Sequence, residues 1–167
     1  MKWLLNLLRR LFFGKNVSFG GKRSEHPQIK LSYRPQKSLF TPSEKRFLEV
    51  LESIAGDVFR VYGKVRISDI LTPDVNKWEK GSGWHWLFSQ ISQKHVDFVI
   101  VDKQFNLVCA VELNDSTHEL PERQKRDVLV TEAFASAKIP LVMINAKSRY
   151  FEKEIADAIA SVVVKFK

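Results

Sequence analysis

Two acidic residues interrupt the most apolar part of the sequence. Asp97 lies within the run HVDFVIV and Glu112 lies near the end of the run LVCAVELN, and both runs are typical of buried strands. Residues 103–106, between the two runs, predict a short hairpin loop. If the strands pair symmetrically about this loop, the numbers of opposed residues sum to 209, and Asp97 faces Glu112.

Opposed carboxylates of this kind predict a metal site. Side chains directly opposite each other on neighbouring strands have Cβ atoms about 4.5–5.5 Å apart. Two negative charges at this spacing in an apolar setting repel each other, so a cation, a basic side chain or a retained proton must compensate. Because the donor atoms are all oxygens, the expected ion is Mg²⁺ or Mn²⁺, with Asp97 and Glu112 as its ligands. Such an ion would bind a phosphate oxygen and activate water for attack on phosphorus.

The same register predicts two apolar faces. The face of the two acids is expected to carry Val99, Val101, Val108 and Ala110. The opposite face is expected to carry Val96, Phe98, Ile100, Leu107, Cys109, Val111 and Leu113. Strands that are apolar on both faces belong at the centre of a sheet covered on both sides. The single cysteine is therefore expected to be a buried thiol in a reducing compartment.

Polar residues crowd the segment that follows the second strand. Asn114, Asp115 and His118 come directly after the run that contains Glu112. Either they shape a turn and a helix cap, or they form the wall of an active site. In the second case His118 is a candidate general acid or base.

Residues 121–137 predict a helix that begins with two arginines on adjacent turns of one face. Arg123 and Arg126 would hold phosphate groups, or would pair with the nearby acids Glu122 and Asp127. The apolar face of this helix is expected to comprise Val128, Leu129, Ala133 and Phe134. A buried strand over 140–146 and a final helix over 148–166 complete the chain.

Three further elements precede the first acid. The segment TPSEKRFLEVLESIAG predicts a helix that Thr41 caps, that Glu44 joins through a capping box and that the final glycine ends. A strand is predicted over 58–67, with a kink at Gly63, and it carries Lys64. An irregular connection follows, which contains Trp78, Trp84 and Trp86. These are expected to anchor the loop by packing rather than to stack on bases. A short helix is predicted over 84–92, with Trp86, Leu87 and Ile91 facing inward.

The order of the elements sets the fold class. A helix, three strands, a helix, a strand and a helix follow one another, and the helices must cover the sheet. The expected architecture is α/β in the broad sense, an α+β three-layer arrangement with a mixed central sheet flanked by helices.

At this point the sequence resembles a known family pattern. A helix with an acid, followed by strands that carry Asp97 and Glu112, resembles the core of the PD-(D/E)XK nucleases. The stretch KHVDFVI…AVELNDSTH…RQKRD…IPLVMI resembles a bacterial domain-of-unknown-function family (2726) related to very-short-patch-repair endonucleases. The resemblance covers roughly residues 38–145 and implies a restriction-endonuclease-like core.

The resemblance also implies roles for individual residues. Asp97 matches the metal-binding aspartate of the pattern, Glu112 its second acid, and Glu44 its supporting helical acid. The polar residues that match the repair-endonuclease-like branch are Asp115, His118, Arg123, Arg126 and Asp127. The pattern places lysine two residues after its second acid, and this chain has Asn114 there. Lys64 or Lys94 is the candidate to supply the missing charge.

These correspondences imply a Mg²⁺- or Mn²⁺-dependent endonuclease-like phosphodiesterase that acts on DNA. The expected nucleic-acid-binding residues are Arg123, Arg126 and Lys94. The alternative is a nuclease-fold module without catalysis, which binds nucleic acid or a protein partner and is placed, in one version, at a membrane surface.

The net charge of +8 is confined to the N-terminal arm. Residues 1–37 hold nine of the 27 Lys and Arg and one of the 19 acids, so residues 38–167 hold eighteen of each. Residues 1–15 predict an amphipathic helix that lies on an anionic membrane surface, or one that packs on a protein. They are too short and too charged to span a bilayer, and no signal-peptide cleavage site follows. Residues 16–37 are expected to be a basic linker and 38–167 the nuclease-like domain, in a cytoplasmic protein that is peripheral to the inner membrane.

Overall fold

The computed structural model describes residues 31–114 and 121–166, except for the side chains of residues 121–123 and 166. Residues 38–167 form one compact unit, separate from residues 1–37. The helix predicted over 1–15, most of the basic linker and the loop with Asp115 and His118 lie outside this description. Within the residues that are described, no helix is long and apolar enough to cross a membrane.

The unit is a mixed α+β domain whose helices and strands follow the predicted order. All predicted elements except the last helix end within two residues of their expected bounds. The elements are α2 (Pro42–Ala55), β1 (Arg60–Arg66), the 3₁₀ turn η1 (Ile67–Asp69), α3 (Trp84–Ile91), β2 (His95–Val101), β3 (Leu107–Asn114), α4 (Pro121–Ser136), β4 (Leu141–Asn145), α5 (Glu152–Val163) and the 3₁₀ turn η3 (Val164–Phe166).

The last helix begins at Glu152, later than predicted, because the residues before it form a turn. The hydroxyl of Tyr150 accepts a hydrogen bond from the backbone N–H of Lys147 at 3.0 Å, and Tyr150 is buried. This contact holds the chain in a turn where the sequence pattern predicted helix.

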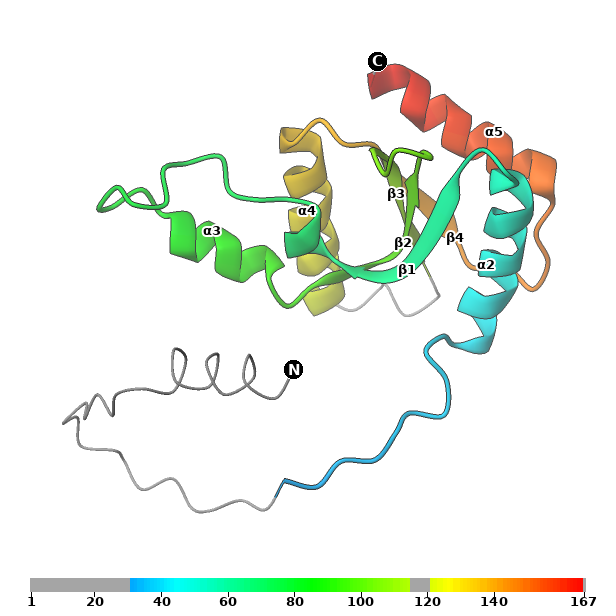
Figure 1. Ribbon diagram of the computed structural model, residues 1–167, viewed down its shortest axis with the longest axis horizontal. Coiled ribbons are helices and arrows are strands. Elements are labelled where there is room, and N and C mark those ends of the chain that lie inside the picture. The colour runs from blue at the N-terminus through cyan, green and yellow to red at the C-terminus, as the bar shows by residue number, and fades with distance from the viewer. Residues whose placement is uncertain (1–30, 115–120, 167) are drawn as a thin grey trace, which may run out of the picture. The chain divides into compact units, whose positions relative to one another are not determined.

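The strands form one four-stranded sheet in the order β1-β2-β3-β4. β1, β2 and β3 pair antiparallel, whereas β4 pairs parallel to β3. A parallel neighbour requires a crossover connection, and α4 supplies it. Figure 1 shows the sheet between two helical layers, with α2 and α5 on one face and α3 and α4 on the other. The mixed sheet flanked by helices is therefore confirmed.

The predicted register of the central hairpin is confirmed over three consecutive residue pairs, from Phe98–Val111 to Ile100–Cys109, whose numbers all sum to 209. An irregularity between Ile100 and Val101 then pairs Val101 with Leu107. Because the side-chain period of a strand is two, this shift exchanges the faces of the residues beyond it.

The two sides of the sheet form separate hydrophobic cores. One core, beneath α2 and α5, is built mainly from Phe47, Leu51, Phe98, Ile100, Cys109, Val111, Val142, Ile144 and Ile155. The other core is built from Ile67, Leu71, Ile91, Val96, Val99, Val101, Ala110, Val130 and Phe134.

Three of the predicted face assignments were wrong. Leu107 packs with the core of Val99, and Val108 packs with the opposite core, because the irregularity at Val101 exchanges them. Val96 also lies in the core of Val99. At that end of the hairpin the backbone pairing is interrupted, so the simple alternation of faces fails.

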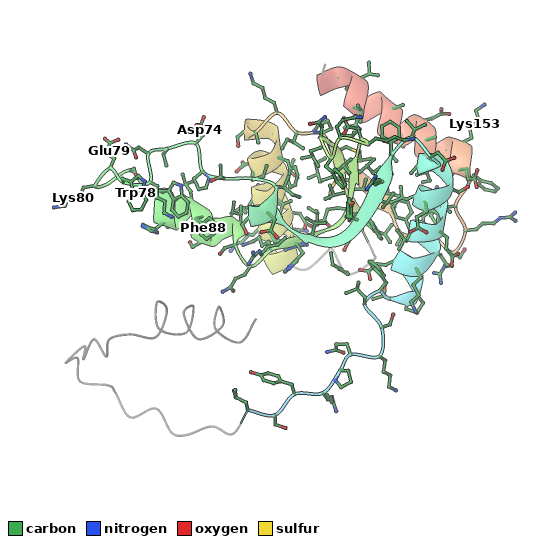
Figure 2. The ribbon with its side chains drawn as sticks, in the orientation of Figure 1. Asp74, Trp78, Glu79, Lys80, Phe88 and Lys153 are labelled. Carbon is green, nitrogen blue, oxygen red and sulfur yellow. The ribbon has the colours of Figure 1, made fainter. Side chains whose placement is uncertain are left out.

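Two of the three tryptophans do not anchor their loop as predicted. Trp78 and Trp86 are 87% and 66% exposed, and Figure 2 shows Trp78 projecting from the loop that precedes α3. Trp84 is half-buried: its ring stacks on Phe88 with centroids 4.8 Å apart, and the ammonium of Lys77, from the loop, lies 4.6 Å from its centroid. Of the three residues expected to face inward from α3, only Ile91 is buried, because this eight-residue helix is apolar on several sides and buries only one.

The predicted apolar face of α4 needs one correction. Val128 is 57% exposed, whereas Val130 is buried together with Phe134. Val130 and Phe134 are four residues apart and therefore lie on one side of a helix, and Val128 lies on another.

Candidate active site

Asp97 on β2 and Glu112 on β3 are neighbours at the open end of the central hairpin. The regular pairs end at Phe98 and Val111, one residue before the two acids, and a carboxylate oxygen of Asp97 accepts a hydrogen bond from the backbone N–H of Leu113 at 3.0 Å. Glu112 is only 6% exposed. Burial raises the pKa of Glu112 to about 8, and the charge and hydrogen bonding of Asp97 add to this rise while Arg126 opposes it. The two acids therefore form one coupled group.

Lys64 brings a positive charge to this group from β1. Its ammonium forms an ion pair with the Glu44 carboxylate and lies 3.4 Å from an Asp97 carboxylate oxygen. Lys64 has a φ of +56°, so the irregularity predicted at Gly63 falls one residue later. The left-handed backbone at Lys64 accompanies a gap in the ladder, since Gly63 and Val65 pair with β2 and Lys64 does not.

Glu44 holds Lys64 from the first turn of α2. One of its carboxylate oxygens accepts from the backbone N–H of Thr41 at 2.7 Å, which closes the predicted capping box, and the other binds Lys64. Burial alone would raise the pKa of Glu44, but the hydrogen bonds from Lys64 and Thr41 lower it below its usual value. Burial likewise opposes the charge of Lys64, yet its bond to Glu44 and the charge of Asp97 raise its pKa. Both groups are therefore ionised at neutral pH.

Arg126 joins α4 to Glu112. Its guanidinium lies 3.3 Å from a Glu112 carboxylate oxygen and 3.4 Å from one of Asp127. It also donates a hydrogen bond to the backbone carbonyl of His95 at 3.1 Å. Arg126 was expected either to hold a phosphate group or to pair with a nearby acid. In the structure it pairs with acids: the expected Asp127 and, in addition, Glu112.

Asn114 stands at the end of β3, where the resemblance places lysine. It lies two residues after Glu112 and thus on the same side of the strand. Its side-chain oxygen is buried and accepts no hydrogen bond within the described structure. An acceptor in this state lacks a donor or a cation.

Of the remaining predicted site residues the structure describes only the side chain of Lys94, and it does not reach the carboxylates. The ammonium of Lys94 donates to the backbone carbonyl of Gln90 at 2.5 Å, and in the described part of the chain it contacts neither acid. Lys94 caps the end of α3 and so is excluded as the substitute for the motif lysine in this conformation. The side chains of His118 and Arg123 lie outside the described structure.

Backbone groups complete the site, and sequence reasoning missed them. The N–H of Leu113 fixes Asp97, and the carbonyl of His95 fixes Arg126. Backbone donors and acceptors leave no signal in residue type. The pairing of Arg126 with Glu112 was also missed, although both residues had been singled out.

The oxygen donors of the site suit a hydrated divalent cation. Among the residues described, no three His, Cys, Asp or Glu side chains gather into a metal-binding group. Mg²⁺, however, is commonly held by one or two carboxylates, with water and substrate phosphate completing its shell. The neighbouring acids Asp97 and Glu112 could supply such ligands, together with the Asn114 oxygen, which has no partner among the described residues.

Comparison with known proteins gives one match. The model of a family described as "Protein of unknown function (DUF2726)" matches residues 36–162. No curated protein and no solved structure matches the chain. The match covers the whole sheet, together with every residue of the site described above.

Proposed function

The chain belongs to the DUF2726 family, and because the description of that family specifies no activity, we propose a function from the geometry of the site. The proposed function is hydrolysis of DNA phosphodiester bonds by a Mg²⁺-dependent domain with a restriction-endonuclease-like core. The observation that carries this proposal is the pair of neighbouring acids, Asp97 and Glu112, with the ammonium of Lys64 3.4 Å from Asp97.

Asp97 and Glu112 are the residues that would hold Mg²⁺. When bound, the ion would polarise a phosphate oxygen and lower the pKa of a water molecule. Two features of the site suit the binding of Mg²⁺. One is a buried acid beside a second acid, and the other is the oxygen of Asn114, which has no partner among the described residues. Arg126 opposes the rise in the pKa of Glu112 and so favours the ionised form that would bind the ion.

Lys64 supplies the charge that the motif lysine would give. Because its pKa is raised, Lys64 stays protonated, and its role is to stabilise negative charge rather than to accept a proton. Glu44 fixes the ammonium beside Asp97. In the proposed reaction a water oxygen bonds to phosphorus and the bond to the leaving sugar oxygen breaks. One proton of that water passes to solvent and the leaving oxygen takes up another, giving a phosphate monoester and a free hydroxyl.

Cleavage assays on purified full-length protein test this proposal. Supercoiled, linear duplex and single-stranded DNA are incubated with Mg²⁺ or with EDTA. Asp97→Asn and Glu112→Gln should each lower the Mg²⁺-dependent rate at least about a hundredfold. Asp157→Asn, which removes an exposed acid of α5, is the matched control and should cleave like the wild type. Folded wild type that cuts none of these substrates, or site variants that cut equally well, would disprove the assignment.

A second candidate is a nuclease-fold module that binds nucleic acid without cleaving it. Asn114 favours this candidate, since an amide carries no charge in the place of the motif lysine. Calorimetric titration with Mn²⁺ separates the two: a binding module shows no ion binding but retains affinity for DNA in EDTA. Asn114→Lys adds a further test, because a restored lysine should increase cleavage only in a site that already binds the ion.

A further inference from the structure

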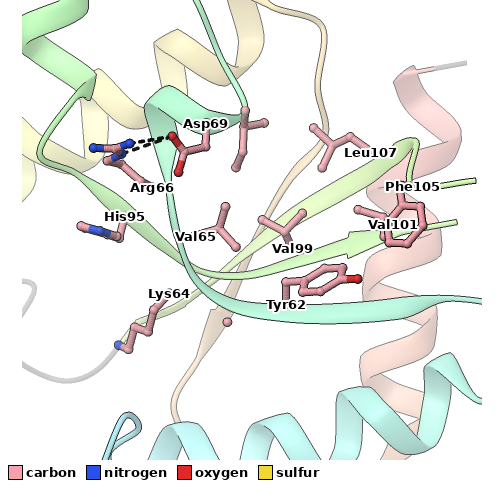
Figure 3. A pocket seen from close by; sticks show the side chains of 12 residues that line it. Tyr62, Lys64, Val65, Arg66, Asp69, His95, Val99, Val101, Phe105 and Leu107 are labelled. Carbon is pink, nitrogen blue, oxygen red and sulfur yellow. Dashed lines mark hydrogen bonds and ion pairs between the residues drawn. The ribbon is translucent and has the colours of Figure 1, made fainter. Parts of the chain in front are cut away.

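A groove of about 720 Å³ opens on the sheet beside the candidate active site. Its floor is formed by apolar residues of β1 and β2, including Val65 and Val99. Figure 3 shows Lys64, Arg66 and His95 at one end of the groove and the rings of Tyr62 and Phe105 at the other. Asp69 lies at the same end as Arg66, so an end of mixed charge and an aromatic end share one apolar floor.

The aromatic end is fixed in place by the hairpin loop. Phe105 has a φ of +65° and its ring is 59% exposed, a combination that costs free energy in the free protein. The carboxylate of Asp102 accepts hydrogen bonds from the backbone N–H groups of Gln104 and Asn106, at 2.9 and 2.8 Å, and so holds this loop. The guanidinium of Arg60 lies 4.5 Å from the centroid of the Phe105 ring. The ring is thus held at the surface, where a planar ligand can reach it.

The charged end belongs to both the groove and the active site. Lys64 lines the groove, and its ammonium forms an ion pair with Glu44 and lies 3.4 Å from an Asp97 carboxylate oxygen. Arg66 pairs with Asp69 at 2.9 Å, and Asp69 also lines the groove. Because both cations at this end are paired with acids, the features that select a ligand are the apolar floor and the two exposed rings, which suit stacked planar groups.

We infer that the groove binds the unpaired bases of a single nucleic-acid strand, whose bases stack on Tyr62 and Phe105. In a duplex the faces of the bases are covered by their neighbours, whereas unpaired bases offer a face to each ring. This inference rests on the proposed function and deepens it, since it names single-stranded or locally unpaired DNA as the preferred substrate.

Binding measured in EDTA tests the inference without any need for cleavage. Fluorescence anisotropy compares the affinity of the full chain for a short fluorescein-labelled oligo-dT and for a duplex. Tyr62→Leu and Phe105→Leu keep apolar volume but remove the ring, and each should weaken oligo-dT binding at least about fivefold while leaving duplex binding unchanged. Phe105→Tyr keeps the ring and should retain the affinity. Trp78→Leu, which removes an exposed ring outside the groove, should change the affinity less than about twofold.

The outcomes separate the groove from the active site. Three results would overturn the inference. They are a wild-type protein that does not bind oligo-dT, ring variants that bind oligo-dT normally, and ring variants that lose as much affinity for the duplex as for oligo-dT. If cleavage depends on Asp97 while the ring variants bind oligo-dT normally, the proposed phosphodiesterase activity is supported and the proposed role of the groove is wrong. If nothing is cleaved but Phe105→Leu still weakens oligo-dT binding selectively, the groove is supported as a binding site and the proposed phosphodiesterase activity is wrong.

Discussion

Asp97 and Leu113 are joined by a hydrogen bond of 3.0 Å, in which the side chain of one strand accepts from the backbone of the next. The regular pairs of β2 and β3 stop at Phe98 and Val111, so a carboxylate takes over where the ladder ends. The bond fixes one acid of the site against the strand that carries the other. Asp97 is consequently a structural partner of Glu112 as well as its source of repulsion.

The stability of the protein should depend on the ionisation of Glu112. Because the pKa of this buried acid is raised to about 8 from an ordinary 4.5, the folded state holds a proton that the unfolded state releases. Stability should therefore fall as pH rises from about 4.5 to 8 and level off above that. The loss between about pH 5 and pH 8 should be on the order of 2–4 kcal/mol in EDTA, measured by urea denaturation. Glu112→Gln should remove this pH dependence, so the unfolding free energy of the variant should exceed that of the wild type most at about pH 8 and above.

Two comparisons test whether Glu112 causes this pH dependence of stability. Asp157→Asn removes an exposed acid and should keep the wild-type pH dependence. Added Mg²⁺ should flatten the wild-type slope but not that of Glu112→Gln, since a bound cation favours the carboxylate. Parallel pH profiles for wild type and Glu112→Gln would show that Glu112 ionises normally.

Glu44 should have two separable roles, one in the cap of α2 and one in holding Lys64. Glu44→Gln keeps an oxygen for the N–H of Thr41 but removes the charge that binds Lys64. We expect a loss of about 1–3 kcal/mol in unfolding free energy and a clear fall in cleavage rate. The pKa of Glu44 is lowered, so its contribution is present above its unfolded pKa and is lost as pH falls. The variant should therefore differ least from wild type in acid.

Thr41→Ala is the matched control for the cap. It removes the hydroxyl that accepts from the backbone N–H of Glu44 at 3.3 Å, and it should cost about 1 kcal/mol of stability. It leaves the bond between Glu44 and Lys64 in place, so cleavage per folded molecule should not change. Equal losses of activity in Thr41→Ala and Glu44→Gln would mean that Glu44 acts only through the helix cap.

Cys109 should be unreactive in the native protein. Its side chain is 0% exposed, and burial raises the pKa of the thiol to about 12. Little thiolate is then present at neutral pH, and reagents cannot reach it. Ellman's reagent should titrate one thiol in denaturant and essentially none in native protein over the same time. Rapid native labelling would indicate that β3 opens locally.

The central hairpin could be predicted from the sequence because two independent features, the apolar pattern of the strands and the short loop, indicated the same register. The apolar period and the short loop both predicted the register that the pairs Phe98–Val111 to Ile100–Cys109 confirm, and the cap of α2 was readable from Thr41 and Glu44 alone. The face assignments failed at both ends of these pairs, at Val96 and beyond Val101, where one irregular position exchanged the faces of Leu107 and Val108. Such irregularities depend on local backbone geometry, which residue type does not encode.

The partners of the site were harder to predict than its acids. Lys64 and Lys94 were both candidates in the sequence, and in the structure Lys64, which has a left-handed backbone, is the one that lies beside Asp97. The groove beside Lys64 combines residues from β1, β2 and the hairpin loop. Their adjacency follows from strand pairing rather than from any motif. The exposure of Trp78 was missed because loop tryptophans usually pack against their own domain.

Gly63 should be required for close packing rather than for backbone freedom. It is not among the glycines with positive φ, but a Cβ at this position would overlap the ring of Phe40. That ring stacks on Phe98 with centroids 5.8 Å apart, so Gly63→Ala must displace it. The expected cost is about 1–3 kcal/mol of unfolding free energy, measured in urea.

A double-mutant cycle with Phe40 distinguishes this account from an intrinsic effect of alanine in β1. In Phe40→Ala protein the obstructing ring is gone, and alanine is favoured over glycine within a strand. Gly63→Ala should then cost nothing or add slight stability, so the two changes should be non-additive by about 1 kcal/mol or more. Strictly additive losses would place the cause in the strand itself. In that case Gly63→Ala should also disturb the adjacent Lys64, and the cleavage rate would fall in both backgrounds.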